Sequence, residues 1–156
     1  MDAFERKEDR PNHLLWLNTQ FILYYFFLFL LSFWWAELDS GVMVLIPAFI
    51  SGLGDGLAEP VGVNFGRTGC GTGRDCTYRT HGCCTKHDYV RSVPGSSMVL
   101  LSGYLGVGLA YSQYTTWQFV IAMVFIPPLG CVVEAKAPHT LDNPSIACTA
   151  ILYIPW

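Results

Sequence analysis

Charged side chains are scarce in this sequence: Asp, Glu, Lys and Arg make up only 13% of its 156 residues. A soluble domain usually carries about a quarter of charged residues, so the composition argues against an ordinary soluble domain. Basic residues are in the minority, nine against twelve acidic ones, and this excludes the basic signature of a nucleic-acid-binding protein. The chain is instead 52% hydrophobic and 15% aromatic, which is typical of a membrane protein.

Four long apolar segments predict an all-α, multi-span integral membrane protein. The first, Leu14–Ala36, carries no charge and is long enough to cross the bilayer as a helix, which takes about twenty residues. Trp16 near one end and Trp34–Trp35 near the other suit the two membrane interfaces. Pro127–Pro128 is expected to kink or break the fourth segment. The four predicted spans are residues 14–36, 41–58, 94–111 and 117–133.

The two ends of the chain are not predicted to be membrane spans. Residues 1–13 form a polar tail of mixed charge, and the apolar run after it is longer than a signal-peptide core, which favours a true span. Ser145–Trp156 starts a further apolar run that is too short to span alone. We therefore expect one transmembrane domain, residues 14–156, which is either truncated or ends along the membrane surface.

A basic loop predicts the orientation. By the positive-inside rule, the polar loop Arg67–Arg91 lies on the cytosolic side, or on an equivalent side such as a plastid stroma. In a eukaryote the membrane would be that of the endoplasmic reticulum or of a plastid. Four spans then place the N-terminus, this loop and the loop Glu134–Pro144 on one side, which favours a single site. The basic residues of the loop are Arg67, Arg74, Arg79, Lys86 and Arg91.

Two carboxylates, Asp55 and Glu59, directly follow the second apolar run, in the stretch 54–66, GDGLAEPVGVNFG. An acid near the end of a hydrophobic span is costly to place there and indicates a functional site. If the helix continues through Glu59, the four-residue spacing puts both carboxylates on one face. A divalent cation, a nearby arginine or protonation of one acid would offset their repulsion. The alternative is a helix end with two solvated acids and a glycine-rich turn.

Two more polar stretches lie next to predicted spans. Arg91–Ser96, RSVPGS, precedes a predicted helix whose free N–H groups would face an anion, and Pro94 suits the first helical turn. Its plainer interpretation is an ordinary helix cap beside an interfacial arginine. Glu134–Pro144, EAKAPHTLDNP, has the alternative interpretation of a turn. Its His139 is a candidate general base, although a lone loop histidine is more often only solvated.

In their order, intervals and membrane context, these stretches resemble the motifs of the membrane polyprenol kinase group. This group comprises phytol, farnesol and dolichol kinases and CTP-dependent diacylglycerol kinases, and phosphatidate cytidylyltransferase is similar more distantly. There, a GD-[GT]-x-A-[DE]-x-x-G-x-x-[FY]-G segment ends one span. A basic-Ser-x-x-Gly-Ser/Thr segment opens the next, and an acidic segment with Asp-Asn follows two spans later. The resemblance covers roughly residues 50–144, and Arg91 stands where the group usually has lysine.

The resemblance implies a kinase that uses a nucleotide, CTP by analogy, and Mg²⁺ to phosphorylate the hydroxyl of a lipid alcohol. A cytidylyltransferase acting on a phospholipid is the alternative enzyme, and a divergent membrane protein without catalysis is the alternative outside enzymes. The implied catalytic residues are Asp55, Glu59 and Asp142, and Asp55 and Asp142 would also hold the metal. The implied nucleotide- and phosphate-binding residues are Gly54, Gly56, Arg91, Ser92, Gly95, Ser96, Glu134 and Asn143.

The loop between the first two motifs is rich in residues that bind zinc. Thiolates and imidazoles are zinc ligands, but the spacing here is not the paired C-x₂-C pattern of structural zinc sites. Zinc is therefore the weaker of the two metal predictions. The residues are Cys70, Cys76, His81, Cys83, Cys84 and His87.

Overall fold

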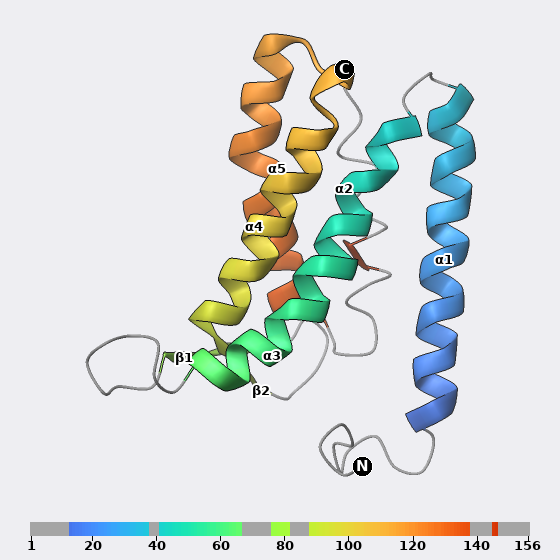
Figure 1. Cartoon of the computed structure of the whole chain (residues 1–156). Helices are drawn as coiled ribbons and strands as arrows, with labels where there is room; N and C mark the ends of the chain where they lie inside the picture. The colour runs from blue at the N-terminus through green and yellow to red at the C-terminus, as the bar shows by residue number, and fades with distance from the viewer. Residues whose placement is uncertain (1–12, 38–40, 67–75, 82–87, 138–144, 147–156) are drawn as a thin grey trace.

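The computed structural model describes residues 13–37, 41–66, 76–81, 88–137 and 145–146. Within these ranges the protein is a bundle of helices with a short β-hairpin at one end (Figure 1), so the predicted all-α class is confirmed. Three helical stretches are long and apolar enough to cross a membrane, namely Asn18–Glu37, Gly41–Phe65 and Thr116–Lys136. The apolar helix Val93–Leu109 has 17 residues, fewer than the roughly twenty that a span needs, so four spans remain a prediction.

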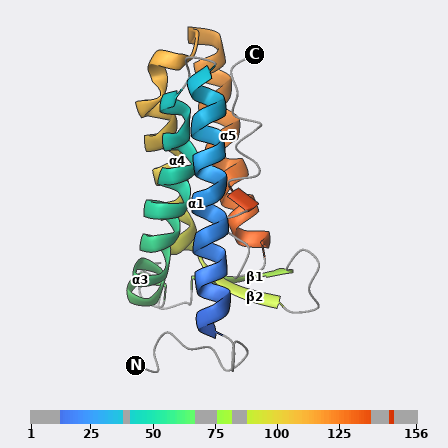
Figure 2. The same ribbon diagram turned by 90° about the vertical axis from the view of Figure 1, so that its right-hand side faces the viewer.

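The first helix, α1, runs from His13 to Glu37 at the side of the bundle (Figure 1), and it lies in front of the other helices in the view of Figure 2. Most of its described side chains are apolar and exposed. Trp35, however, is completely buried, whereas Trp34 is 45% exposed. Trp35 packs in the core beside Leu31, and the interfacial depth of both tryptophans stays a prediction. Burying so large an apolar ring attaches the end of α1 to the rest of the bundle.

The second helical stretch is longer than predicted. It consists of the 3₁₀ turn η2 (Gly41–Val44), the short helix α2 (Leu45–Ala48), the π-helical segment η3 (Phe49–Asp55) and the helix α3 (Gly56–Phe65). The predicted end at Ala58 is therefore wrong, and the acidic stretch lies inside a helix instead of in a turn. The stretch ends at Gly66, whose N–H donates to the carbonyl of Gly62 at 2.9 Å.

The π-helical segment explains how this stretch stays in contact with its neighbour. Gly54, Ala58 and Gly62 all touch the helix that begins at Val93. In a regular α-helix a four-residue step turns about 40° beyond a full turn, so these positions and Ile50 would drift off a common face. A π turn spans one more residue than an α turn. The wider turn at η3 therefore reduces the drift over the step from Ile50 to Gly54.

The next helix, α4 (Val93–Leu109), starts at the N-cap Ser92, whose Oγ accepts a hydrogen bond from the N–H of Gly95 at 3.2 Å. The predicted capped helix start is thus confirmed. The 3₁₀ turn η4 (Tyr111–Gln113) then leads to the last long helix. On the inner face of α4 the small residues Gly103 and Gly106 let neighbouring backbones approach closely.

The last long helix, α5 (Thr116–Lys136), begins with a capping box formed by Thr115 and Gln118. It continues through Pro127 and Pro128, so the predicted break does not occur. Pro127 is buried against α4, where a Cβ on Gly103 would lie only 3.0 Å from it. The glycine makes room for the ring, and a packed neighbour helps a membrane helix tolerate proline.

The hairpin consists of β1 (Thr77–His81) and β2 (Asp88–Ser92), which pair antiparallel. It lies in a region predicted only as a polar loop. Its backbone is tied to both neighbouring helices, because the N–H of Cys76 donates to the carbonyl of Gly66 at 2.8 Å and the N–H of Val93 donates to the carbonyl of Cys76 at 2.9 Å. The hairpin is therefore fixed where α3 ends and α4 begins.

The buried core lies between the second helical stretch, α4 and α5. Its members are almost all aliphatic, as expected for an interior packed without polar groups. The predicted N-terminal tail lies outside the described residues apart from His13, and so does the predicted C-terminal run apart from Ser145 and Ile146. The largest members of the core include Trp35, Met43, Ile46, Ile50, Val99, Val107, Ile126 and Ile146.

Candidate functional site

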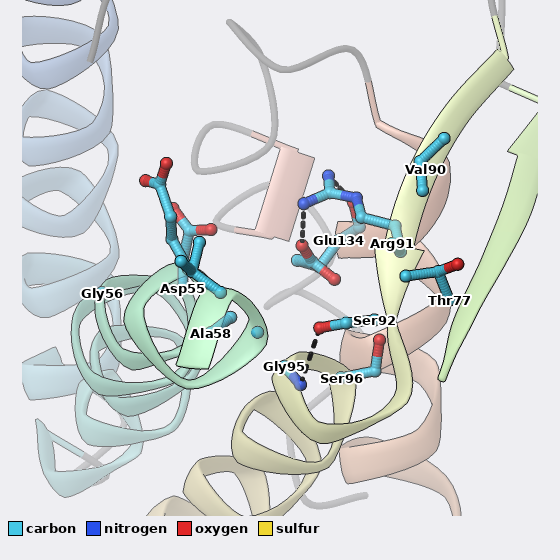
Figure 3. A pocket seen from close by; sticks show the side chains of 13 residues that line it. Asp55, Gly56, Ala58, Thr77, Val90, Arg91, Ser92, Gly95, Ser96 and Glu134 are labelled. Atoms are coloured by element: carbon cyan, nitrogen blue, oxygen red, sulfur yellow. Dashed lines mark hydrogen bonds and ion pairs between the residues drawn. The ribbon is translucent and has the colours of Figure 1, made fainter. Parts of the chain in front are cut away.

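A cavity of about 400 Å³ opens at the end of the bundle that carries the hairpin. The helix α3 and the strand β2 face each other across it, with the start of α4 and the end of α5 between them (Figure 3). Its volume lies in the range of small-molecule sites, roughly 300–1,000 Å³. The lining residues are Asp55, Gly56, Ala58, Glu59, Gly62, Val63, Thr77, Val90, Arg91, Ser92, Gly95, Ser96 and Glu134.

Residues of all three predicted motifs meet in this cavity. Asp55, Gly56 and Glu59 come from the first motif, Arg91, Ser92, Gly95 and Ser96 from the second, and Glu134 from the third. Gly54 does not line the cavity. It packs instead against α4, where a Cβ would come within 2.5 Å of Ser102 Oγ. Asp142, Asn143 and His139 lie outside the described residues, so a shared metal site of Asp55 and Asp142 stays a prediction.

Asp55 and Glu59 line the same side of the cavity. Asp55 is the last residue of η3 and is half-buried, while Glu59 lies one turn later on α3 and is exposed. The four-residue spacing acts as predicted once the helix continues through both. Asp55 also lies close enough to Glu134 for the two carboxylates to repel each other. The acidic side of the cavity is therefore built from two different helical stretches.

Arg91 and Glu134 form an ion pair across the cavity floor. Arg91 Nη1 donates to Glu134 Oε1 at 2.7 Å, and Arg91 Nη2 donates to the Glu134 backbone carbonyl at 3.1 Å. The Glu134 side chain is only 2% exposed, and a buried carboxylate needs such a partner. Arg91 Nε is also buried and has no acceptor among the described residues.

The backbones of α3 and α4 touch directly beneath the cavity. A Cβ on Gly62 would lie 2.5 Å from Ser92 Oγ, and a Cβ on Gly95 would lie 2.8 Å from the carbonyl oxygen of Ala58. A side chain at Gly95 would push the two helices apart, because the atom it meets is backbone, whereas one at Gly62 would displace the capping hydroxyl of Ser92. Ser92 is both the helix cap and a cavity residue, so the two interpretations of its motif are not exclusive.

The hairpin contributes residues that the sequence motifs did not include. Thr77 and Val90 line the cavity. On the other face of the hairpin, the Tyr78 hydroxyl hydrogen-bonds with Ser96 Oγ at 2.5 Å, and Thr80 Oγ1 donates to the Ala135 carbonyl at 3.1 Å. The sequence signal that could have predicted the two strands is the recurrence of β-branched and aromatic residues in the short segments TYRTH and DYVRS.

The zinc prediction involves residues that the structure describes only in part. Cys76 is disulfide-bonded, so it has no thiolate to offer a metal. Cys70, Cys83, Cys84 and His87 lie outside the described residues. Within the described ranges, no group of three or more His, Cys, Asp or Glu side chains is arranged to hold a metal ion.

Comparison with known proteins adds no family assignment. No protein-family model, no curated protein and no solved structure matches this chain. The resemblance to the polyprenol kinase group therefore depends on the motifs alone.

Proposed function

We propose that this protein is a membrane kinase that transfers a phosphoryl group from a nucleotide, CTP, to the hydroxyl of a polyprenol or a similar lipid alcohol. The observation that carries the proposal is the meeting of three sequence motifs in one cavity. Asp55 and Glu59, the segment from Arg91 to Ser96, and Glu134 all contribute to its lining. Their meeting in one cavity is what a single site built from these motifs requires.

The chemistry of the lining suits phosphoryl transfer. This reaction needs positioning of the phosphates and neutralisation of their charge more than covalent help from the protein. The guanidinium of Arg91 is a fixed cation, and Ser96 adds a hydroxyl at the start of α4, where helix N–H groups favour an anion. Asp55 and Glu59 offer the carboxylate oxygens that Mg²⁺ prefers. When bound there, Mg²⁺ would neutralise charge on the transferring phosphoryl group.

The surroundings of the cavity suit an acceptor that is part lipid. The helix α3 forms one wall, and its Leu57, Val63 and Phe65 are 41%, 71% and 54% exposed. An apolar surface beside a polar cavity lets a lipid alcohol place its hydroxyl in the site while its chain stays outside. By the positive-inside rule, the site would face the cytosol or a plastid stroma, in a membrane of the endoplasmic reticulum or of a plastid.

The test is to follow two labels with the unaltered protein. Purified protein receives either a lipid alcohol or phosphatidate as acceptor, together with CTP that is labelled on either the γ- or the α-phosphate. The kinase proposal predicts that the γ-label reaches the lipid and that the α-label does not. If only the α-label reaches lipid, with a phosphatidate acceptor, the protein is a cytidylyltransferase. If neither label reaches any lipid acceptor, the proposed catalysis is wrong and a structural role is left.

A further inference from the structure

We propose that Tyr78 is a positioning residue of this site: it holds the hydroxyl of Ser96 so that the Ser96 proton is donated to a phosphate oxygen in the cavity. The inference rests on the proposed function and extends it to a residue outside the three motifs. Ser96 lines the cavity, and the Tyr78 hydroxyl lies 2.5 Å from Ser96 Oγ. This contact carries the argument.

The hydroxyl of Ser96 is held away from its own helix. The next serine of α4, Ser97, bonds back onto the helix, because its Oγ donates to the Pro94 carbonyl at 2.7 Å, as helical serines often do. Ser96 bonds instead with Tyr78 on the hairpin. In Figure 3 the Ser96 hydroxyl points from α4 towards the strands. The bond with Tyr78 therefore sets the direction of a side chain that lines the cavity.

The strand register places Tyr78 beside the cation of the site. Tyr78 pairs directly with Arg91 across the antiparallel ladder, and directly paired residues project to the same face. Arg91 lines the cavity and bonds with Glu134 on α5, so this face of the hairpin meets the helices. One cross-strand pair thus supplies both the cation of the cavity and the residue that holds Ser96.

Ser96 is also fixed through its main chain. The thiol of Cys131 on α5 donates to the Ser96 carbonyl at 3.7 Å. The residue is therefore held by β1 through its side chain and by α5 through its backbone. A group that is already fixed loses little freedom when a ligand binds, which favours binding.

The chemistry of the two hydroxyls indicates the direction of their bond. Each hydroxyl has one proton to donate and can also accept, and a phenol is a stronger hydrogen-bond donor than an aliphatic alcohol. With Tyr78 as the donor, Ser96 keeps its own proton for a second acceptor. A phosphate oxygen in the cavity is such an acceptor, and the bond from Tyr78 polarises Ser96 into a better donor to it.

The experiment measures the dissociation constants of inorganic tripolyphosphate and of CTP with Mg²⁺ in an uncharged, lipid-free detergent. Tyr78→Phe removes the positioning hydroxyl, and Ser96→Ala removes the hydroxyl that contacts the ligand. Each variant has a matched control outside the cavity lining. Thr80→Val removes another hydrogen bond that holds the same face of the hairpin, the one to the Ala135 carbonyl. Ser97→Ala removes a serine hydroxyl that bonds within α4.

We expect Ser96→Ala to weaken the binding of both probes about tenfold, the effect of one lost charge-assisted contact. Tyr78→Phe should weaken it about fivefold, the scale of one hydrogen bond, because the freed serine hydroxyl can turn back to a carbonyl of its own helix. The double variant Tyr78→Phe/Ser96→Ala should bind like Ser96→Ala alone, since Tyr78 acts through Ser96.

The hairpin control separates positioning from anchoring. Thr80→Val should lower the unfolding temperature about as much as Tyr78→Phe, because each loses one hydrogen bond of the hairpin, and yet leave the binding of both probes unchanged. Ser97→Ala should also bind them like the parent protein. In turnover, Tyr78→Phe should raise KM for CTP while kcat changes little, as expected when a ground-state contact is lost.

Three binding results would overturn the inference. One is equal weakening by Thr80→Val and Tyr78→Phe, since the Tyr78 hydroxyl would then only anchor the hairpin. Another is a double variant in which the two losses multiply, since Tyr78 would then contact the ligand itself. The third is binding by Ser96→Ala that equals that of the parent protein.

The inference and the kinase proposal can fail separately. If tripolyphosphate binding depends on Tyr78 and Ser96 and no phosphate reaches a lipid, only the kinase proposal fails. If phosphate reaches a lipid and both Tyr78→Phe and Ser96→Ala bind the probes like the parent protein, only the inference fails. If the parent protein binds neither probe, both fail.

Discussion

Glu134 Oε1 lies 2.7 Å from Nη1 of Arg91, and this ion pair joins the end of α5 to the strand β2 at the cavity. Two residues from different predicted motifs therefore hold each other in place. The residue after Arg91 in the chain, Ser92, is the N-cap of α4. Local packing and the arrangement of the site depend on the same contact.

Breaking this pair from one side should destabilise the protein strongly. Arg91→Met leaves the buried Glu134 carboxylate without its partner, a change that costs about 3–5 kcal/mol for buried pairs. The double variant Arg91→Met/Glu134→Met should recover much of the loss, because no buried charge is left over. Unfolding of both variants in detergent measures the difference. A double variant less stable than the single one would contradict this account.

The close contact of α3 and α4 predicts a contrast between two glycines. Gly95→Ala places a methyl group 2.8 Å from the Ala58 carbonyl oxygen, which is backbone and cannot rotate away. Overpacking of this kind costs about 1–3 kcal/mol. Gly52→Ala is the matched control, since nothing lies within 4 Å of its added Cβ, and it should fold at least as well as the parent. Equal thermal stability of the two variants would argue against the direct helix contact.

The anchoring of the hairpin predicts a smaller effect. Tyr78→Phe removes the hydroxyl that bonds with Ser96 and should cost about 1 kcal/mol, the usual net value of a hydrogen bond. It should also weaken CTP binding, because Ser96 lines the cavity. Tyr111→Phe is the control, at an exposed residue in the turn η4. The prediction is wrong if both tyrosine variants lower the unfolding temperature and CTP binding equally.

The predicted orientation is open to a direct test. Basic residues favour the cytosolic side for the hairpin, whereas the disulfide of Cys76 is of a kind that persists mainly in oxidising compartments. A glycosylation sequence inserted between β1 and β2 should stay unmodified in microsomes. The same insertion at η4, at the opposite end of the bundle (Figure 1), should be modified. Glycosylation of the insertion between β1 and β2 would show that the predicted orientation is wrong.

Much of this architecture is predictable because apolar run length alone distinguishes a membrane helix from a loop. The helix α1 matches Leu14–Ala36 within one residue at either end. The helix α5 is not broken at Pro127, which packs against Gly103 in another helix, and local sequence does not reveal that contact. The predicted end of the second stretch was wrong, because the helix continues past Asp55 to Phe65 through a glycine-containing segment that local sequence favours as a turn.

The site could be predicted only in part, because local sequence shows which residues are polar but not which residues they meet. The motif residues Asp55, Glu59, Arg91 and Glu134 were identified as polar groups in unlikely positions, and they do line one cavity. The ion-pair partner of each residue could not be predicted. Arg91 pairs with Glu134 and not with either acid of the first motif. The hairpin was missed because its strands are short and polar. Strand pairing then decides which side chains border the site.

The most direct test of the central claim is transfer of the γ-phosphate of CTP to a lipid alcohol by the variant Asp55→Asn. The exchange keeps the shape of a cavity residue and removes its charge, so we expect turnover to fall at least about 100-fold, the scale of losing one electrostatic group in an active site. Glu37→Gln, which removes an exposed carboxylate at the end of α1, should leave turnover unchanged. Full activity of Asp55→Asn would contradict the assignment of the site.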